Sequence, residues 1–121
     1  MIKLEGITKN INNNVILNEI NICFPQTGLI GIIGESGAGK STLLNILSGY
    51  LKPSAGDYYY NQIDMLKNNH KTWDNIRKND MSFIFQECKL FDNLTLEENI
   101  KTYLITCNKN IEPDKVNEVL D

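Results

Sequence analysis

Gly34-Glu35-Ser36-Gly37-Ala38-Gly39-Lys40-Ser41 is the stretch of this sequence that decides its fold. It matches the pattern G-x-x-x-x-G-K-[ST] of the phosphate-binding loop, or P-loop. The glycines permit backbone angles that are closed to other residues, so that consecutive N–H groups can turn toward one anion. A helix that begins directly after the loop adds the positive end of its dipole. The pattern therefore predicts a loop that binds the phosphates of a nucleotide.

The polar residues of this loop have distinct chemical uses. Lys40 would place a compact cation against the β- and γ-phosphates, and the Ser41 hydroxyl is a hard oxygen ligand suited to Mg²⁺. The Thr42 hydroxyl would reach the α-phosphate side. The alternative, a glycine turn that matches by chance, is disfavoured because the loop follows an apolar run and opens an amphipathic helix. We expect the nucleotide to contact Gly34, Glu35, Ser36, Gly37, Ala38, Gly39, Lys40, Ser41 and Thr42.

The apolar residues around the loop predict an α/β fold with a P-loop core. Residues 29–33 form a short apolar run, typical of a strand buried on both faces of a mainly parallel sheet. Residues 41–51 carry leucines at helical spacing, and Pro53 ends this helix. Residues 81–85 are a second candidate for a buried strand. Together these segments predict a partial parallel sheet.

Antiparallel strands are expected before and after the P-loop helix. Residues 2–8 and 15–24 look like two strands joined by an asparagine-rich turn at 12–14. From Glu19 to Phe24 apolar and polar residues alternate, which is the pattern of a half-buried antiparallel strand. Residues 57–60 and 63–65 suggest another short strand pair. These segments predict an antiparallel β subdomain.

Three further helices are expected towards the C-terminus. A short one lies near residues 73–78, within a polar stretch. Thr95-x-x-Glu98 is a capping box that opens a helix running to about Cys107. Pro113 suits the first turn of a last helix, whose apolar stripe is Val116, Val119 and Leu120.

The composition excludes several classes of function. The chain has 121 residues, a formal net charge of -3 and 41% hydrophobic residues, which indicates a globular domain. The acidic balance disfavours nucleic acid as a partner. Cys23, Cys88 and Cys107 are widely spaced and are expected to be buried, small apolar residues in a reducing compartment. The N-terminus is charged and no apolar run reaches about 18 residues, so we expect a cytoplasmic protein.

Three segments resemble the ATP-binding-cassette (ABC) transporter ATPases: the P-loop together with the residues that follow it up to Leu47, residues 81–86, and residues 90–100. The latter two segments are similar to the Q-loop region of that family. The resemblance covers nearly the whole chain. In its sequence the chain is most similar to the lipoprotein-release and macrolide or peptide exporter branch. It implies an ATP-binding subunit that uses ATP and Mg²⁺ and couples ATP hydrolysis to transmembrane transport, in the direction of export.

The resemblance also implies roles for individual residues. Lys40 and Gln86 would be catalytic, with Gln86 reaching the attacking water and the Mg²⁺ that Ser41 also binds. The loop after Gln86 would meet a transmembrane permease subunit, which places the protein at the inner face of the cell membrane. Ile11 lies near the position where family members usually carry an aromatic residue that stacks on adenine, so an apolar contact would replace that stacking.

Three motifs of the family match no stretch of this sequence: the signature motif, the Walker B acidic strand and the switch histidine. His70 precedes the Q-loop and is expected to be a surface residue instead. Hydrolysis in the family needs these motifs and a second ATP-binding domain. We therefore expect that this chain alone is inactive and corresponds to the truncated N-terminal part of the domain. Residues 1–93 would form the β subdomain and P-loop core, and residues 94–121 the start of a helical subdomain.

Two other interpretations stay open at this point. The chain could be a non-catalytic remnant that binds nucleotide weakly or not at all, since the Walker B strand is central to the expected parallel sheet. It could also be a small P-loop kinase. Such a kinase needs arginines clustered over the transferred phosphate, and Arg77 is the only arginine of this sequence.

Overall fold

The computed structural model of the chain describes residues 1–86 and 90–106. It consists of two compact units, Met1–Arg77 and Lys78–Asp121. The subdomain boundary expected after residue 93 stays a prediction. Cys88, Cys107 and the helix expected from Pro113 lie outside the described residues.

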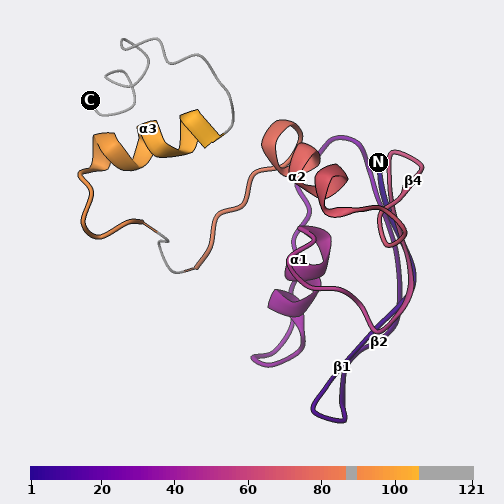
Figure 1. The fold of residues 1–121 in the computed structure, drawn as a ribbon. Coiled ribbons are helices and arrows are strands. Elements are labelled where there is room, and N and C mark those ends of the chain that lie inside the picture. The colour runs from indigo at the N-terminus through magenta and orange to yellow at the C-terminus, as the bar shows by residue number, and fades with distance from the viewer. Residues whose placement is uncertain (87–89, 107–121) are drawn as a thin grey trace. The chain divides into compact units, whose positions relative to one another are not determined.

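The first unit is built on a four-stranded antiparallel sheet (Figure 1). Its strands are β1 (Ile2–Ile11), β2 (Asn14–Phe24), β3 (Ala55–Tyr60) and β4 (Ile63–Asp64), in the order β2-β1-β3-β4. Asn12 and Asn13 link β1 to β2 with φ of 48° and 64°, a conformation that asparagine tolerates and that suits a tight hairpin. The expected antiparallel β subdomain is confirmed.

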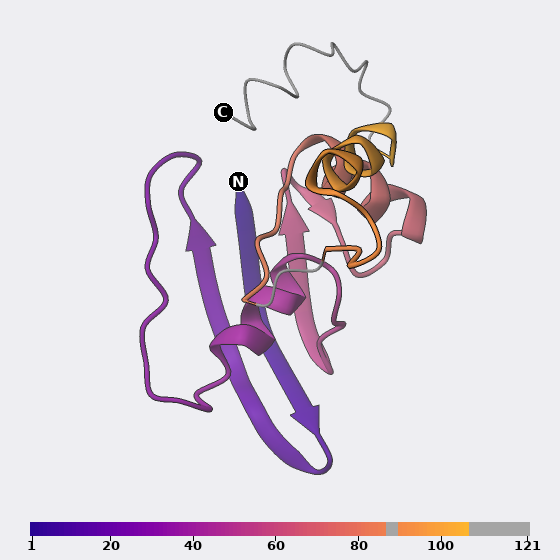
Figure 2. The same cartoon turned by 90° about the vertical axis from the view of Figure 1, so that its left-hand side faces the viewer.

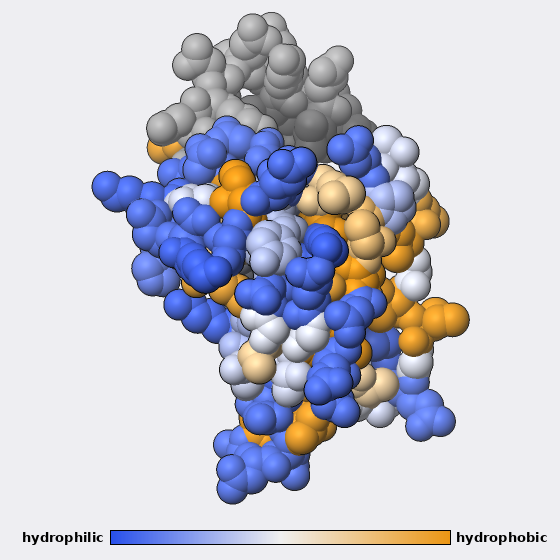
Figure 3. Space-filling view, turned by 90° about the vertical axis from the view of Figure 1, so that its right-hand side faces the viewer, coloured by the Kyte–Doolittle hydropathy of each residue, from blue (hydrophilic) through white to orange (hydrophobic). Residues whose placement is uncertain are grey.

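Helix α1 (Lys40–Leu47) lies over one face of the sheet (Figure 2), and this face carries buried apolar residues. The fully buried residues there are Leu4, Ile7 and Tyr58 from the sheet and Ile46 from the helix. Along the second half of β2, half-buried and exposed residues alternate as predicted. The other face is open, and hydrophilic side chains cover much of it (Figure 3).

Cys23 departs from the sequence-based expectation. The structure leaves it exposed, opposite Lys3 of β1. Alternation along β2 directs Ile22 and Phe24 to the covered face, so that Cys23 must point to the open one. The prediction of a buried cysteine was wrong here because the period of the strand outweighs the apolar character of one residue.

Helix α1 ends earlier than predicted, at Leu47 instead of Leu51. Ser48 caps the helix, and Gly49 follows with φ of 74°, a left-handed conformation that closes helices. A Cβ atom on Gly49 would lie 2.3 Å from Cε3 of Trp73. Glycine is therefore required twice at this position, for its backbone angle and for the close approach of the indole.

The two strands expected for a parallel sheet are not formed. Residues 29–33 and 81–85 take part in no strand pairing among the described residues, and 95% of the Ile33 side chain is exposed. A strand buried on both faces needs hydrogen-bonded neighbours for its N–H and C=O groups. Every strand pair in the described part of the chain is antiparallel and lies elsewhere. Apolar composition alone therefore gave a wrong prediction for both segments.

Helix α2 (His70–Asn79) is preceded by Asn69, whose side-chain oxygen accepts a hydrogen bond from the backbone N–H of Thr72 at 3.2 Å. Trp73 and Ile76 form its buried stripe, and His70 is exposed, as expected. No helix in the described residues is long and apolar enough to cross a lipid bilayer.

Helix α3 (Leu96–Thr106) lies in the second unit and opens with the predicted capping box. The Thr95 backbone N–H donates to Oε2 of Glu98 at 2.7 Å, and the Glu98 N–H donates to the Thr95 hydroxyl at 3.3 Å. The hydrogen bonds from the Thr95 backbone and hydroxyl lower the pKa of the Glu98 carboxyl below its ordinary value. The ionised carboxylate therefore stabilises the first turn of this helix.

This pKa shift predicts an acid-sensitive first turn in α3. Because the folded pKa is lowered, the stabilisation is present above the ordinary pKa of a glutamate and is lost as the pH falls through the folded value. We expect amide exchange at residues 96–100 to speed up between about pH 6 and about pH 3, beyond the intrinsic pH dependence. In Glu98→Gln, which keeps the capping geometry without the charge, this step should vanish. Glu97→Gln is the control, and an equal step in both variants would contradict the assignment.

Candidate functional site

The P-loop connects the segment after β2, which runs in the direction opposite to β2, to the start of α1 (Figure 2). Within the loop, the Ala38 N–H donates to the Glu35 carbonyl at 3.3 Å, which closes a turn. Gly37 and Gly39 have φ of 81° and 84°, in the left-handed region where side chains are disfavoured. The two glycines therefore allow the reversal of the chain that the motif predicted.

Gly39 also brings the loop into contact with the sheet. It is buried, and a Cβ atom there would lie 2.9 Å from Cδ2 of Leu17 and 3.0 Å from the carbonyl oxygen of Ile16. The start of α1 thus packs directly on the backbone of β2. The sequence did not predict this contact, because the glycine pattern indicates a turn and does not indicate which residues the turn packs against.

Lys40 fastens the loop with its side chain. Its Nζ atom donates to the carbonyl oxygens of Gly34, at 2.8 Å, and Glu35, at 2.5 Å. An ammonium group has three donors, so one donor is left beyond these two bonds. Lys40 therefore orders the beginning of the loop and keeps a cation at the mouth of the loop.

The start of α1 is electrostatically suited to an anion. Its first turn contains no acidic residue, and the N-cap Gly39 makes no side-chain capping bond. The N–H groups at a helix start lack partners within the helix, and the helix dipole makes this end positive. Ser41 is exposed there and Thr42 is half-buried. Backbone donors, a hydroxyl and the Lys40 cation meet at one place, which is an arrangement that can bind phosphate groups.

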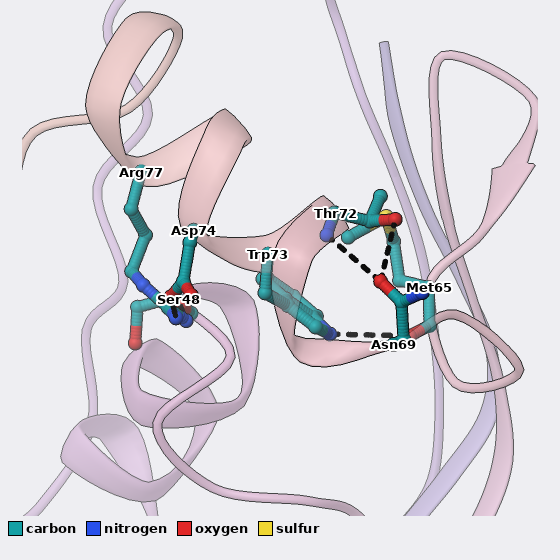
Figure 4. A network of polar contacts seen from close by, with 7 residues as sticks. All are labelled: Ser48, Met65, Asn69, Thr72, Trp73, Asp74 and Arg77. Atoms are coloured by element: carbon teal, nitrogen blue, oxygen red, sulfur yellow. Dashed lines mark hydrogen bonds and ion pairs between the residues drawn. The ribbon is translucent and has the colours of Figure 1, made fainter.

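The opposite end of α1 is held by a cluster of aromatic and basic side chains (Figure 4). The Tyr58 hydroxyl donates to the Leu47 carbonyl at 2.7 Å, and Nη1 of Arg77 donates to the Ser48 carbonyl at 3.4 Å. Trp73 lies between them, with its ring centroid 5.5 Å from that of Tyr58. Sequence reasoning missed this cluster. The spacing of Trp73, Ile76 and Arg77 on one predicted helix face was the available signal.

The remaining predicted site residues lie elsewhere. Ile11 is partly exposed at the end of β1, where it pairs with Asn14 at the tip of the hairpin. Gln86 is exposed and belongs to the second unit, and residues 87–89 after it are outside the described part of the chain. The structure therefore brings the residues from Gly34 to Thr42 together, while a role of Gln86 or Ile11 beside them stays a prediction.

Comparison with known proteins identifies the family. The family model described as "ABC transporter" matches residues 17–121. This match covers the P-loop, α1 and the described part of the Q-loop region. The chain belongs to the ABC transporter family.

Individual relatives include proteins named for opposite directions of transport. The macrolide export ATP-binding/permease protein MacB of Campylobacter jejuni is 34% identical over 93% of this chain and 18% of its own length. The Fe(3+) ions import ATP-binding protein FbpC of Escherichia coli K12 is 31% identical over 82% of this chain and 27% of its own length. The chain thus spans about a quarter or less of these relatives.

A solved structure matches the fold closely. The dimeric bacterial ABC transporter cassette MJ0796 has a TM-score of 0.84 and 29% identity, covering 98% of this chain and 53% of that chain. A second structure of MJ0796 is described as a post-hydrolysis state bound to ADP and Pi, with a TM-score of 0.83. The expected α/β fold of an ABC ATPase cassette is therefore confirmed over about half of such a cassette.

The contact between Gly39 and β2 generates a test of the loop. In Gly39→Ala the new methyl group meets both backbone strain and the Ile16 carbonyl, so we expect a loss of about 1–3 kcal/mol in the free energy of unfolding. Gly37→Ala is the matched control, since it has a similar φ but nothing within 4 Å of the added atom. It should lose only about 1 kcal/mol from strain. Urea unfolding followed by circular dichroism measures both variants, and equal losses would contradict the packing argument.

Proposed function

We propose that this chain is the nucleotide-binding part of an ABC transporter ATPase, which binds ATP through the P-loop. The observation that carries this proposal is the start of α1, where the N–H groups of the first turn lack partners within the helix and where Lys40 and the exposed Ser41 lie. A triphosphate presents several anionic oxygens at the spacing of successive backbone N–H groups. Family membership supports ATP as the ligand, since the post-hydrolysis MJ0796 structure is described as bound to ADP and Pi.

Mg²⁺ fits this site as a partner of the nucleotide. The described residues contain no group of three His, Cys, Asp or Glu side chains that could hold a metal ion. Mg²⁺ commonly keeps several waters and binds one or two protein oxygens together with substrate phosphates. Ser41 would supply such an oxygen, and Gln86 a second one. When bound, the ion would neutralise charge on the β- and γ-phosphates.

The residues of the chain divide the work on the phosphates. The N–H groups of Gly37 to Thr42 would bind the β-phosphate. Lys40 would give up its hydrogen bond to one loop carbonyl and donate to a γ-phosphate oxygen instead. Gln86 would orient the attacking water, which makes it the second catalytic residue beside Lys40. Ile11 would contact the base through its exposed apolar side chain. This base contact lacks an aromatic ring, so we expect weak discrimination between purine bases.

In the whole protein we propose that hydrolysis drives transmembrane transport. The dimeric MJ0796 structure supports a second ATP-binding domain as a partner, and the combined ATP-binding/permease name of MacB supports a permease subunit that meets the loop after Gln86. This assembly would hold the chain at the inner face of the cell membrane. MacB favours export, which we propose as the direction although the relatives include the importer FbpC. Hydrolysis would require the complete domain, so we propose that this chain alone does not turn over ATP.

Ligand-dependent stabilisation tests the binding function directly. A ligand at about 100 times its Kd stabilises the folded state by about 2.7 kcal/mol, so Mg-ATP should raise the melting temperature of the chain by several degrees. In Lys40→Ala most of this rise should be lost, because the cation at the loop is removed.

The control for this test is Lys71→Ala, which removes an exposed lysine of α2. It should keep the full response to Mg-ATP, which excludes a general effect of net charge. If the unmodified chain melts at the same temperature with and without Mg-ATP, nucleotide binding is refuted, and the alternative of a non-binding remnant is favoured.

A further inference from the structure

The C-terminal end of α1 is capped by other elements of the first unit. Its last turn contains no basic residue that could bind the final carbonyl groups. Instead, the Leu47 carbonyl accepts a hydrogen bond from the Tyr58 hydroxyl of β3, and the Ser48 carbonyl accepts one from the Arg77 guanidinium of α2. Carbonyl groups at the end of a helix need such partners when they are covered. These two hydrogen bonds therefore tie the end of α1 to β3 and α2.

The position of Tyr58 is fixed by contacts with Trp73 and Met65. It is fully buried, and its ring meets Trp73 edge-on at an interplanar angle of 61°. The Trp73 indole N–H donates to the Met65 carbonyl at 3.1 Å (Figure 4), and the Met65 N–H donates to the Tyr58 carbonyl at 2.8 Å. The Trp73 ring also packs closely against Gly49. The hydroxyl of Tyr58 thus has one position available, and it specifies where Leu47 must lie.

Burial keeps this hydroxyl in its donating form. The pKa of Tyr58 is raised well above its ordinary value, mainly because the buried phenolate would lose its hydration. Arg77, Asp74 and the rings of Tyr50 and Trp73 surround the neighbouring cap. The Tyr58 hydroxyl therefore stays protonated, and able to donate to Leu47, to a higher pH than an exposed tyrosine would.

The two ends of α1 are mechanically coupled. The helix has eight residues, which corresponds to a length of about 12 Å. Its other end packs against Ile16 and Leu17 through Gly39. A short helix that is held at both ends cannot tilt without moving the N–H groups of its first turn, which are the proposed phosphate donors.

We infer that Tyr58 is a positioning residue for phosphate binding, acting through the Leu47 carbonyl to fix the axis of α1 and thereby the donors of the P-loop. This inference rests on the proposed nucleotide-binding function. A shift of about 1 Å in binding groups can reduce their effect strongly even when the change lies far from the ligand. Tyr58 lies on β3, outside the P-loop motif, and would act without touching the nucleotide.

The experiment compares Tyr58→Phe with Tyr59→Phe in the 121-residue chain. Both variants lose one hydroxyl from β3, but Tyr59 faces the open side of the sheet beside Lys3. Two quantities are measured: the affinity for Mg-ATP by calorimetry, and the backbone amide NMR signals of Gly39, Lys40 and Ser41 without nucleotide. We expect Tyr58→Phe to weaken Mg-ATP binding about five- to tenfold, because nucleotide would then have to order a helix that is no longer held in place, and to shift these amide signals. Tyr59→Phe should change neither.

A second variant guards against a folding defect in Tyr58→Phe. Arg77→Met removes the other capping donor and keeps the apolar stem beside Trp73, and the longer bond to Ser48 predicts a loss of about twofold in affinity. Normal affinity and unchanged amide signals in folded Tyr58→Phe would overturn the inference, as would a loss that only follows the unfolded fraction. If the unmodified chain binds no Mg-ATP, the proposed function fails, and the amide signals still decide whether Tyr58 positions the loop.

Discussion

The contact of Gly39 with the backbone of β2 is the constraint on which the rest of the first unit depends. A side chain at this position would meet the Ile16 carbonyl at 3.0 Å, so the helix can approach the sheet only because glycine is there. The same residue has a left-handed φ and caps the helix. Folding of the loop and packing of the helix are therefore one event. A long-range contact thus fixes the position of one glycine of a local motif.

Two independent anchors at opposite ends of α1 explain why so short a helix is stable. Isolated helices of eight residues are marginal in water, because nucleation costs more than a few hydrogen bonds return. Here the apolar stripe of Leu43 and Ile46 is buried, Gly39 meets the sheet, and Tyr58 caps the last turn. Tertiary contacts thus replace the intrinsic propensity. These contacts therefore also fix the N–H groups of the first turn of α1, the proposed phosphate donors.

The sequence was informative wherever local chemistry decides the structure. The hairpin at Asn12 and Asn13, the capping box of Thr95 and Glu98 and the turn of the P-loop all follow from residue types within a few positions of each other. Prediction failed where the outcome depends on distant partners. Residues 29–33 read as a buried strand, yet a strand exists only beside another strand. The cap of Tyr58 on Leu47 joins residues eleven positions apart in different elements, which no periodicity reveals.

Lys40 shows how a residue of the proposed site can also be a structural one. Its two bonds to the Gly34 and Glu35 carbonyls are charge-assisted but exposed to solvent, so each contributes much less than a desolvated bond of this kind. In the proposed complex, a phosphate would compete with these carbonyls for the same ammonium protons. Its charged oxygens would favour it in this competition, and the backbone N–H groups of α1 would bind it at the same time. Removing Lys40 would therefore loosen the loop before any ligand arrives, whereas changing Tyr58 would leave the loop fastened and misdirect its donors. Substitution of Lys40 would therefore affect the order of the loop, and substitution of Tyr58 the direction of its N–H donors. Both contribute to the binding free energy of the proposed nucleotide.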